Sequence, residues 1–386
     1  MRGSTAIVGV GTAGCGEAPG YSDIEILAEA AARAVADAGL SLCEIDGLCT
    51  ANLNSAMWPL NVCEYLGLRP RFVEGTNIGG AAFVAHLLPA ALALNARLCD
   101  AVLVCYGSTQ RTNTRSRRNK SRARSVLDPA PFESPYEPFL PPSAYALITA
   151  RHMHQYGTTR RHLAEVAVAA RRWAQLNPEA FSRESLTIEE VLASPMLFDP
   201  LTAHDCCLVT DGAAAFVMVR TDRARDLIHA PVHVLGCASA VWHRQVSGME
   251  DLTVTPACDS GPRAYAMAGI SPADVDVVQI YDAFTINTIL ALEDLGFCAK
   301  GEGGPFVSDG AIAPGGLLPV NTNGGGLSCV HPNMYGAFAV IEAVQQLRGA
   351  CGARQVEGAT VALVQGNGGV AASSQATALL GTATAL

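Results

Sequence analysis

Apolar residues along the chain fall into short continuous runs separated by turns that contain glycine or proline. Three of these runs have the length of a buried strand and cover residues 5–11, 47–51 and 101–107. Residues 24–37 show a helical repeat that ends at Gly39, a typical C-cap residue. Residues 79–95 are almost wholly apolar and predict a helix that is buried on every side. Helices and strands of this kind belong in the middle of a layered α/β structure.

The same order of elements recurs in the C-terminal part. Strands are predicted at 232–238, 275–280 and 360–366, one helix covers residues 265–268, and an apolar helix covers residues 337–347. This repetition predicts two βαβαβ halves with a layer of apolar helices between two sheets. We assign residues 1–107 to the first part of the N-terminal half, 108–203 to an inserted loop domain, 204–230 to the end of the N-terminal half and 231–386 to the C-terminal half.

The inserted segment begins with a basic stretch and continues with two predicted helices, at 144–156 and 161–176. The cations of the stretch are Arg111, Arg115, Arg117, Arg118, Lys120, Arg122 and Arg124. A run of this kind is usually a solvated surface. In an acidic protein it also leaves open the attraction of a polyphosphate such as coenzyme A, or of an acidic partner protein.

Composition narrows the class of protein. With 386 residues, 49% hydrophobic and only 16% charged, the chain can bury a large core, and we expect it to meet another subunit through apolar surface. A net charge of −9 argues against nucleic acid as a partner. The apolar runs are far shorter than the roughly 20 residues of a membrane helix, and residues 1–11 are interpreted as a first strand and not as a signal peptide. We therefore expect a cytoplasmic protein with no membrane segment.

The cysteines add to this picture. There are 13 of them, scattered, with no C-x-x-C pair and no zinc spacing. That pattern fits reduced thiols in a cytoplasm and predicts no metal site.

Residues 321–336 contain the first candidate for chemistry. Gly324, Gly325 and Gly326 allow the backbone to approach another segment closely or to adopt positive φ, and Pro332 then fixes a turn ahead of the apolar helix. His331 and Tyr335 are the titratable groups of this loop and lie beside a predicted helix N-terminus, which suits an anion formed during a reaction. The alternative is an ordinary glycine-rich connection to a capped helix.

Tyr281 and Asp282 form the second candidate. They follow the buried strand 275–280 directly and precede a predicted helix at 285–294. Ligands in α/β proteins bind at the carboxyl ends of strands, so the position suits a site. The alternative is an amphipathic tyrosine whose hydroxyl is satisfied within the protein.

Four motifs together carry a resemblance to a known family. They are Tyr281-Asp-Ala-Phe, Gly324-Gly-Gly-Leu-Ser-Cys-Val-His-Pro, Leu197-Phe-Asp-Pro-Leu-Thr-Ala-His-Asp-Cys-Cys with Asp211-Gly-Ala-Ala-Ala, and Met153-His-Gln-Tyr-Gly-Thr-Thr. Their order over nearly the whole chain resembles the thiolase superfamily, and its sterol-carrier-protein-associated branch most closely. The resemblance implies a five-layer αβαβα thiolase fold, a two-fold homodimer and an acyl-CoA substrate.

Two departures from this family matter for the chemistry. Thiolases carry a nucleophilic cysteine at the start of the N-terminal core helix, but residues 75–82 read Gly-Thr-Asn-Ile-Gly-Gly-Ala-Ala. They also carry an acid/base cysteine in a C-terminal turn, where this chain has Gln365-Gly-Asn-Gly-Gly. An acyl-enzyme needs an activated nucleophile, so thiolysis through a thioester is not expected.

The part of the thiolase site that stabilises an enolate is retained. The resemblance implies that His331 donates to the enolate oxygen, and the chain is similar to the thiolase-like aldolases of steroid side-chain degradation, which use two tyrosines. We therefore predict Tyr281 and Tyr335 as the acid/base pair. The predicted substrate-binding residues are Asp282, Asn323, Gly325 and Gly368.

The predicted reaction is retro-aldol cleavage of a steroid side-chain β-hydroxyacyl-CoA to a ketone and a short acyl-CoA such as propionyl-CoA, with no cofactor apart from the CoA of the substrate. Two alternatives stay open: an acyltransferase with a nucleophile such as Cys329, and a non-catalytic acyl-CoA or lipid binder in which the tyrosines are pocket walls. The resemblance also implies a small partner with an OB fold and a zinc ribbon, which would hold any zinc.

Overall fold

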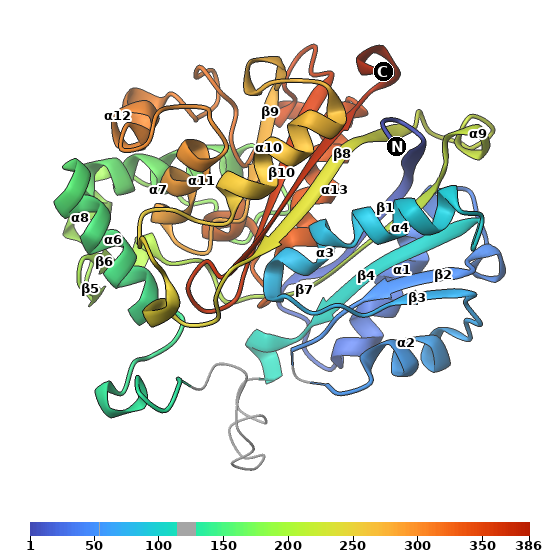
Figure 1. Ribbon diagram of the computed structural model, residues 1–386, viewed down its shortest axis with the longest axis horizontal. Coiled ribbons are helices and arrows are strands. Elements are labelled where there is room, and N and C mark those ends of the chain that lie inside the picture. The colour runs from blue at the N-terminus through green and yellow to red at the C-terminus, as the bar shows by residue number, and fades with distance from the viewer. Residues whose placement is uncertain (54, 114–128) are drawn as a thin grey trace.

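The computed structural model describes residues 1–53, 55–113 and 129–386 (Figure 1). The basic stretch, predicted as a solvated surface with attraction of a polyphosphate or an acidic partner protein left open, lies outside the described residues from position 114 onward. None of the described helices combines the length and the apolar character that a membrane span requires.

The described strands form one large sheet and one small one. The large sheet has nine strands in the order β3-β2-β4-β7-β1-β8-β11-β10-β9. Their bounds are β1 (Thr5–Gly16), β2 (Gly47–Thr50), β3 (Phe72–Glu74), β4 (Ala101–Ser108), β7 (Asp211–Arg220), β8 (Val232–Val241), β9 (Val277–Ile280), β10 (Val361–Gly368) and β11 (Ser374–Gly381). The small sheet pairs β5 (Met196–Phe198) with β6 (Leu201–Thr202).

The large sheet consists of two halves with the same pattern of strand directions. In the N-terminal half β2 and β4 are parallel, and β4, β7 and β1 are antiparallel. In the C-terminal half β9 and β10 are parallel, and β10, β11 and β8 are antiparallel. The halves meet where β1 pairs with β8 over only two residue pairs, Ala6 with His233 and Ile7 with Val232. The expected internal duplication is therefore present, with a short ladder joining the two predicted sheets.

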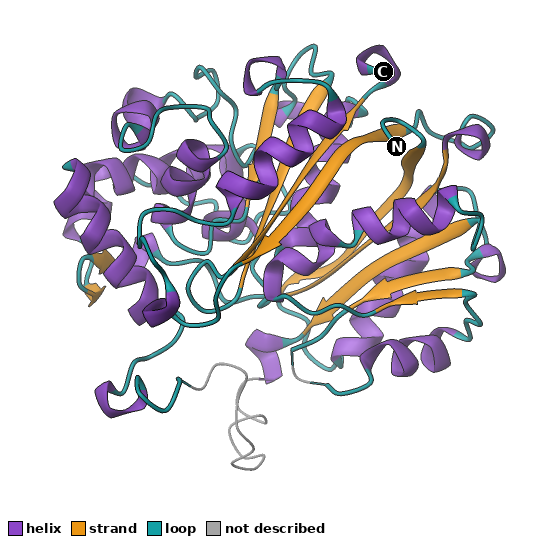
Figure 2. Cartoon of the chain, in the orientation of Figure 1, coloured by secondary structure: helices purple, strands orange, loops and turns teal. Residues whose placement is uncertain are grey.

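Helices form three layers around the two halves of the sheet. Helices α1 (Asp23–Asp37) and α2 (Trp58–Leu66) cover one outer face, and α10 (Ala257–Ala268) and α11 (Thr285–Asp294) cover the other. Between the halves lie α3 (Ala82–Ala85), α4 (Leu87–Asn95) and α13 (Gly336–Leu347), whose side chains share one core cluster with both halves (Figures 1 and 2). The apolar sequences of these central helices follow from burial on all sides.

One predicted helix is interrupted. The segment predicted as a continuous helix over 79–95 consists of a 3₁₀ turn, η2 (Gly79–Ala81), followed by α3 and α4, with a break at His86. Pro89 has no N–H to donate to the carbonyl of Ala85, which weakens the helix at this point. The His86 Nε2 atom lies 2.9 Å from the carbonyl oxygen of Thr76.

The described chain between β4 and β7 is mainly helical. It contains α6 (Pro142–Tyr156), α7 (Arg160–Gln175) and α8 (Ile188–Ala193), and the predicted helices agree with α6 and α7 to within two residues. Side chains of α6 and α7 share a core cluster with α11, and the short helix α12 (Gly303–Val307) joins the same group (Figure 1). This segment therefore packs against the C-terminal half.

Candidate active site

The loop between β9 and α11 carries Tyr281 and is held at its backbone. The Tyr281 N–H donates to the Gln365 side-chain oxygen Oε1 at 3.0 Å. The Tyr281 ring is 4% exposed, and its hydroxyl donates to the backbone carbonyl of Asn333 at 3.1 Å. Tyr281 therefore links β9, β10 and the loop that leads to α13.

Asp282 anchors the glycine-rich turn. Residues Gly325–Cys329 form a short π-helical turn, η8, and the fully buried Asp282 carboxylate accepts from the N–H groups of Gly326 at 2.6 Å and Leu327 at 3.3 Å. A Cβ on Gly325, where φ is +63°, would lie 2.1 Å from Asp282 Oδ2. The predicted substrate-binding residues Asp282 and Gly325 therefore pack against each other. Burial raises the pKa of Asp282 to about 7, although the two N–H groups act in the opposite direction.

The structure brings together Tyr281, from the loop after β9, and His331 and Tyr335, from the loop that leads to α13. The Tyr281 ring lies edge-on to the His331 ring with centroids 5.5 Å apart, and edge-on to the Tyr335 ring with centroids 5.6 Å apart. Tyr335 is fully buried, and its hydroxyl donates to the side-chain oxygen of Asn323 at 3.0 Å. Asn323, also predicted to bind substrate, therefore contacts the acid/base candidate directly.

His331 presents a buried nitrogen without a partner. Within the described part of the chain its Nε2 atom makes no hydrogen bond, whereas its backbone N–H donates to the hydroxyl of Thr210 at 2.9 Å. Burial lowers the pKa of His331 to about 4, so the imidazole is neutral at pH 7. Such an unpaired group in a buried position is suited to a hydrogen bond with a ligand.

Both tyrosine hydroxyls are protonated at neutral pH. Burial raises the pKa of Tyr281 and that of Tyr335 well above the ordinary value for a phenol. The nearby Asp282 carboxylate raises the pKa of Tyr335 further. A phenolate would therefore be costly here, and the hydroxyls start as hydrogen-bond donors.

Gly80 explains how the Tyr281 ring fits. A Cβ on Gly80 would lie 2.2 Å from Tyr281 Cε2 and 2.5 Å from its hydroxyl oxygen. The Tyr281 ring thus occupies the space that a side chain at the start of the central helices would need. The predicted residue Gly368 packs on the same segment, since its Cβ would lie 2.0 Å from the carbonyl oxygen of Ile78. Sequence reasoning missed Gly80, for which the Gly79-Gly80 pair was the available signal.

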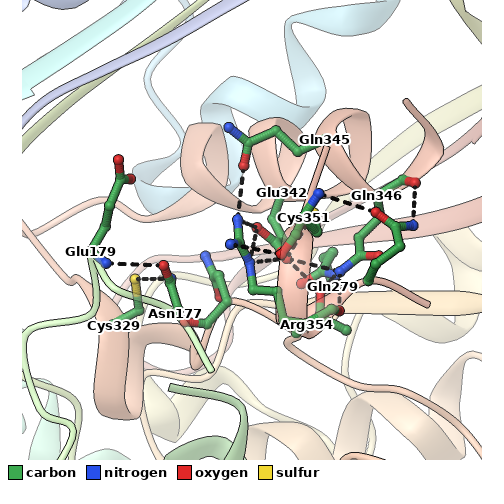
Figure 3. A network of polar contacts seen from close by, with 12 residues as sticks. Asn177, Glu179, Gln279, Cys329, Glu342, Gln345, Gln346, Cys351 and Arg354 are labelled. Carbon is green, nitrogen blue, oxygen red and sulfur yellow. Dashed lines mark hydrogen bonds and ion pairs between the residues drawn. The ribbon is translucent and has the colours of Figure 1, made fainter. Parts of the chain in front are cut away.

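A buried polar network supports the backbone that carries Asn323. Glu342 on α13 is 2% exposed and forms an ion pair with Arg354, with 3.0 Å between Oε2 and Nη2 (Figure 3). The Thr322 hydroxyl donates to Glu342 Oε1 at 2.7 Å and accepts from the Gln279 amide at 2.9 Å. Because Thr322 precedes Asn323, this network fixes the residue that binds the Tyr335 hydroxyl. Neither Glu342 nor Arg354 was predicted, since only tertiary contacts bring them together.

Cys329 lies near Asn323, because Asn177 contacts both residues, and it is an unsuitable nucleophile. Its sulfur accepts from the Asn177 amide at 3.6 Å, and burial raises the pKa of its thiol well above the ordinary range (Figure 3). The cavity that it lines has a volume of about 30 Å³. That volume holds water but not an acyl chain.

The described residues contain no group of three or more His, Cys, Asp or Glu side chains placed to hold a metal ion. The histidine of α6 that is buried, His152, instead lies 2.8 Å from the Thr158 hydroxyl and 3.1 Å from a Glu293 carboxylate oxygen.

Comparison with known proteins identifies the class. Residues 238–382 match the family model described as thiolase C-terminal domain-like. A 17-hydroxy-3-oxo-4-pregnene-20-carboxyl-CoA lyase of Mycobacterium tuberculosis is 34% identical, over 90% of this chain and 92% of its own. An acetyl-CoA acetyltransferase of Methanothermobacter thermautotrophicus is 33% identical, over 95% and 97%. The chain therefore belongs to the thiolase superfamily, and the predicted thiolase fold is confirmed.

A solved structure is similar along the whole chain. The Ltp2-ChsH2(DUF35) aldolase superposes with a TM-score of 0.88 at 29% identity, over 99% of this chain and 98% of that one. Sequence identity alone does not separate lyases from acetyltransferases here, because the two relatives differ by one percentage point. The chemistry therefore has to be argued from the residues of the site itself.

Proposed function

We propose that the protein is a carbon–carbon lyase that cleaves a β-hydroxyacyl-CoA with a steroid-like acyl group by a retro-aldol reaction. The single observation that carries this proposal is that Tyr281 fills the space beside Gly80. No nucleophilic side chain fits at position 80, while Tyr281, His331 and Tyr335 stay grouped. The resemblance to a lyase named for a steroid CoA ester and to a solved aldolase supports the substrate class.

The reaction balances without an oxidant or a reductant. The β-hydroxyl loses its proton and becomes the carbonyl of a ketone, while the bond between the α and β carbons breaks. The electron pair of that bond moves into the thioester enolate, and protonation of the α carbon gives a short acyl-CoA such as propionyl-CoA. One proton is taken and one is delivered, so the cycle has no net proton change.

The grouped side chains supply the required functions. We assign to His331 the role of hydrogen-bond donor to the enolate oxygen, because its neutral ring can donate from Nε2. Tyr281 and Tyr335 are the acid/base pair. Because burial disfavours a free phenolate at either position, the two proton transfers are expected to be coupled. Asp282, Asn323, Gly325 and Gly368 remain the proposed substrate-binding residues.

The proposal extends to the assembly. The solved relative is described as a complex with a DUF35 component, and we propose a small partner with an OB fold and a zinc ribbon, together with a homodimer of this chain. The described surface exposes large apolar side chains, among them Phe132, Tyr136 and Phe139, which suit contact with other subunits. The 13 cysteines are all free, which supports a cytoplasmic location.

Product analysis tests the function. The protein is co-expressed with an OB-fold partner and incubated with a panel of β-hydroxyacyl-CoA esters, including one with a steroid ring system. The expected result is a ketone and a short acyl-CoA in equal amounts without added free CoA. Turnover that requires free CoA would identify a thiolase, and ligand binding without turnover would identify a binding protein.

A further inference from the structure

We infer that Tyr145, on α6, is a positioning residue that holds Tyr281 in its reactive place, an inference that rests on the proposed lyase function. Tyr145 is 2% exposed and comes from the helical segment between β4 and β7, which is remote in sequence from both catalytic loops. Its hydroxyl oxygen ends a chain of side-chain hydrogen bonds that starts at the backbone of Tyr281.

The chain runs through three amide side chains. The Tyr281 N–H donates to Gln365 Oε1 at 3.0 Å, and Gln365 Nε2 donates to Gln375 Oε1. Gln375 Nε2 donates to Asn367 Oδ1 at 2.8 Å, and Asn367 Nδ2 donates to the Tyr145 hydroxyl oxygen at 2.8 Å. Every amide donates from its nitrogen and accepts at its oxygen, so one orientation satisfies the whole chain. Because all the links are buried, a break at one of them leaves polar groups without partners.

Tyr145 contacts the same loop a second time through its ring. The ring stacks on Phe284, three residues after Tyr281, with centroids 4.5 Å apart and planes 25° apart. The hydroxyl oxygen also accepts from the Ala372 N–H at 3.0 Å, which attaches the turn between β10 and β11. Tyr145 thus holds both ends of the loop 281–284 against the C-terminal turn.

The hydroxyl oxygen of Tyr145 is the part that matters for this role. Phenylalanine at position 145 would keep the stack on Phe284 but would leave the N–H donors of Asn367 and Ala372 without an acceptor. We expect the amide chain to rearrange and Tyr281 to shift. Displacement of a reacting group by about 1 Å can lower a rate by about 100-fold.

The test is a double-mutant cycle on the protein–partner complex. Tyr145→Phe is expected to lower kcat by about 10- to 100-fold with KM little changed, because Tyr145 acts on orientation and not on binding. In the Tyr281→Phe background, measured under single-turnover conditions, adding Tyr145→Phe should change the rate by less than about two-fold. Tyr265→Phe is the matched control, since Tyr265 is also buried and donates to the backbone carbonyl of Leu295, away from the site.

The outcomes are distinguishable. A wild-type complex that does not cleave any ester would reject the proposed function itself. If the wild type is active and Tyr145→Phe matches the Tyr265→Phe control in kcat, or lowers the rate as much in the Tyr281→Phe background as in the wild type, the positioning role is overturned. Should Tyr145→Phe not fold, Gln375→Met breaks the same chain in its middle, and the same loss of kcat and the same non-additivity are then expected.

Discussion

The hydroxyl oxygen of Tyr281 lies 2.5 Å from the point where a Cβ on Gly80 would be. The two residues belong to different halves of the fold, and their contact sets where the Tyr281 ring can lie. A side chain at position 80 and the ring at position 281 exclude each other. The absence of a side chain at position 80 and the place of the Tyr281 ring are therefore linked.

This contact predicts the effect of a small substitution. Gly80→Ala should push the Tyr281 ring aside and lower kcat for aldol cleavage by about 100-fold, because the ring cannot keep its position. Steady-state kinetics of the complex would measure the loss. Gly248→Ala is the control, since Gly248 is exposed and the nearest described atom to its Cβ would be the Cβ of His243, at 3.3 Å. Unchanged kinetics in Gly80→Ala would show that the tyrosine position is not critical.

Tyr335→Phe removes the hydroxyl that bonds Asn323. We expect kcat to fall by about 10²- to 10⁴-fold, the usual contribution of a positioned acid or base, with KM within a few-fold of the wild type. Thermal unfolding should stay close to that of Tyr265→Phe, which loses one buried hydroxyl elsewhere. A rise in KM at constant kcat would instead make Tyr335 a wall of the binding pocket.

His331 predicts a specific pH dependence of stability. Its pKa is about 4 in the folded chain and near 6.5 when unfolded, so the unfolded chain binds more protons between these values. The free energy of unfolding should therefore rise with pH from 4 to 6.5, and the contribution of His331 is lost as pH falls through this window. The contribution is about 3 kcal/mol. Urea unfolding of the wild type and His331→Gln at pH 4.5 and pH 7 measures it. An equal change in the free energy of unfolding between the two pH values for both proteins would contradict the prediction.

Loss of one partner of the Glu342–Arg354 ion pair should destabilise the fold more than loss of both charges. Arg354→Met leaves the buried Glu342 carboxylate without its charged partner and should lower the free energy of unfolding by about 3–5 kcal/mol. Adding Glu342→Gln removes the uncompensated charge, so the double variant should be more stable than Arg354→Met. Denaturant titration of the three proteins tests this order, which a double variant less stable than Arg354→Met would refute.

Cys329 separates the lyase from an acyltransferase. Cys329→Ala should keep kcat within about two-fold of the wild type, because the buried, protonated thiol takes no part in the reaction. Intact-mass analysis of the wild type after incubation with substrate should show no acyl adduct. An adduct that disappears in Cys329→Ala would establish covalent catalysis and reject the mechanism proposed above.

Local patterns in the sequence determined the elements and their order. The bounds of α11, Thr285–Asp294, agree with those predicted, because the preceding strand, the loop and the helical repeat are all encoded by neighbouring residues. The repeat of strands and apolar helices predicted the duplicated, layered fold. Four motifs in the order found in thiolases indicated the thiolase superfamily. The absence of the nucleophilic and the acid/base cysteine of thiolases was also visible in the sequence alone.

Tertiary structure alone decided how the site is held. Three features of the site depend on contacts between segments far apart in the chain. These are the packing of Tyr281 on Gly80, the ion pair of Glu342 and Arg354 that supports the backbone next to Asn323, and the amide chain that joins Tyr145 to Tyr281. Periodicity reports which face of an element is buried, but not which side chain of another element it meets. Only when the fold packs these segments together does the missing side chain of Gly80 leave the space that the Tyr281 ring fills.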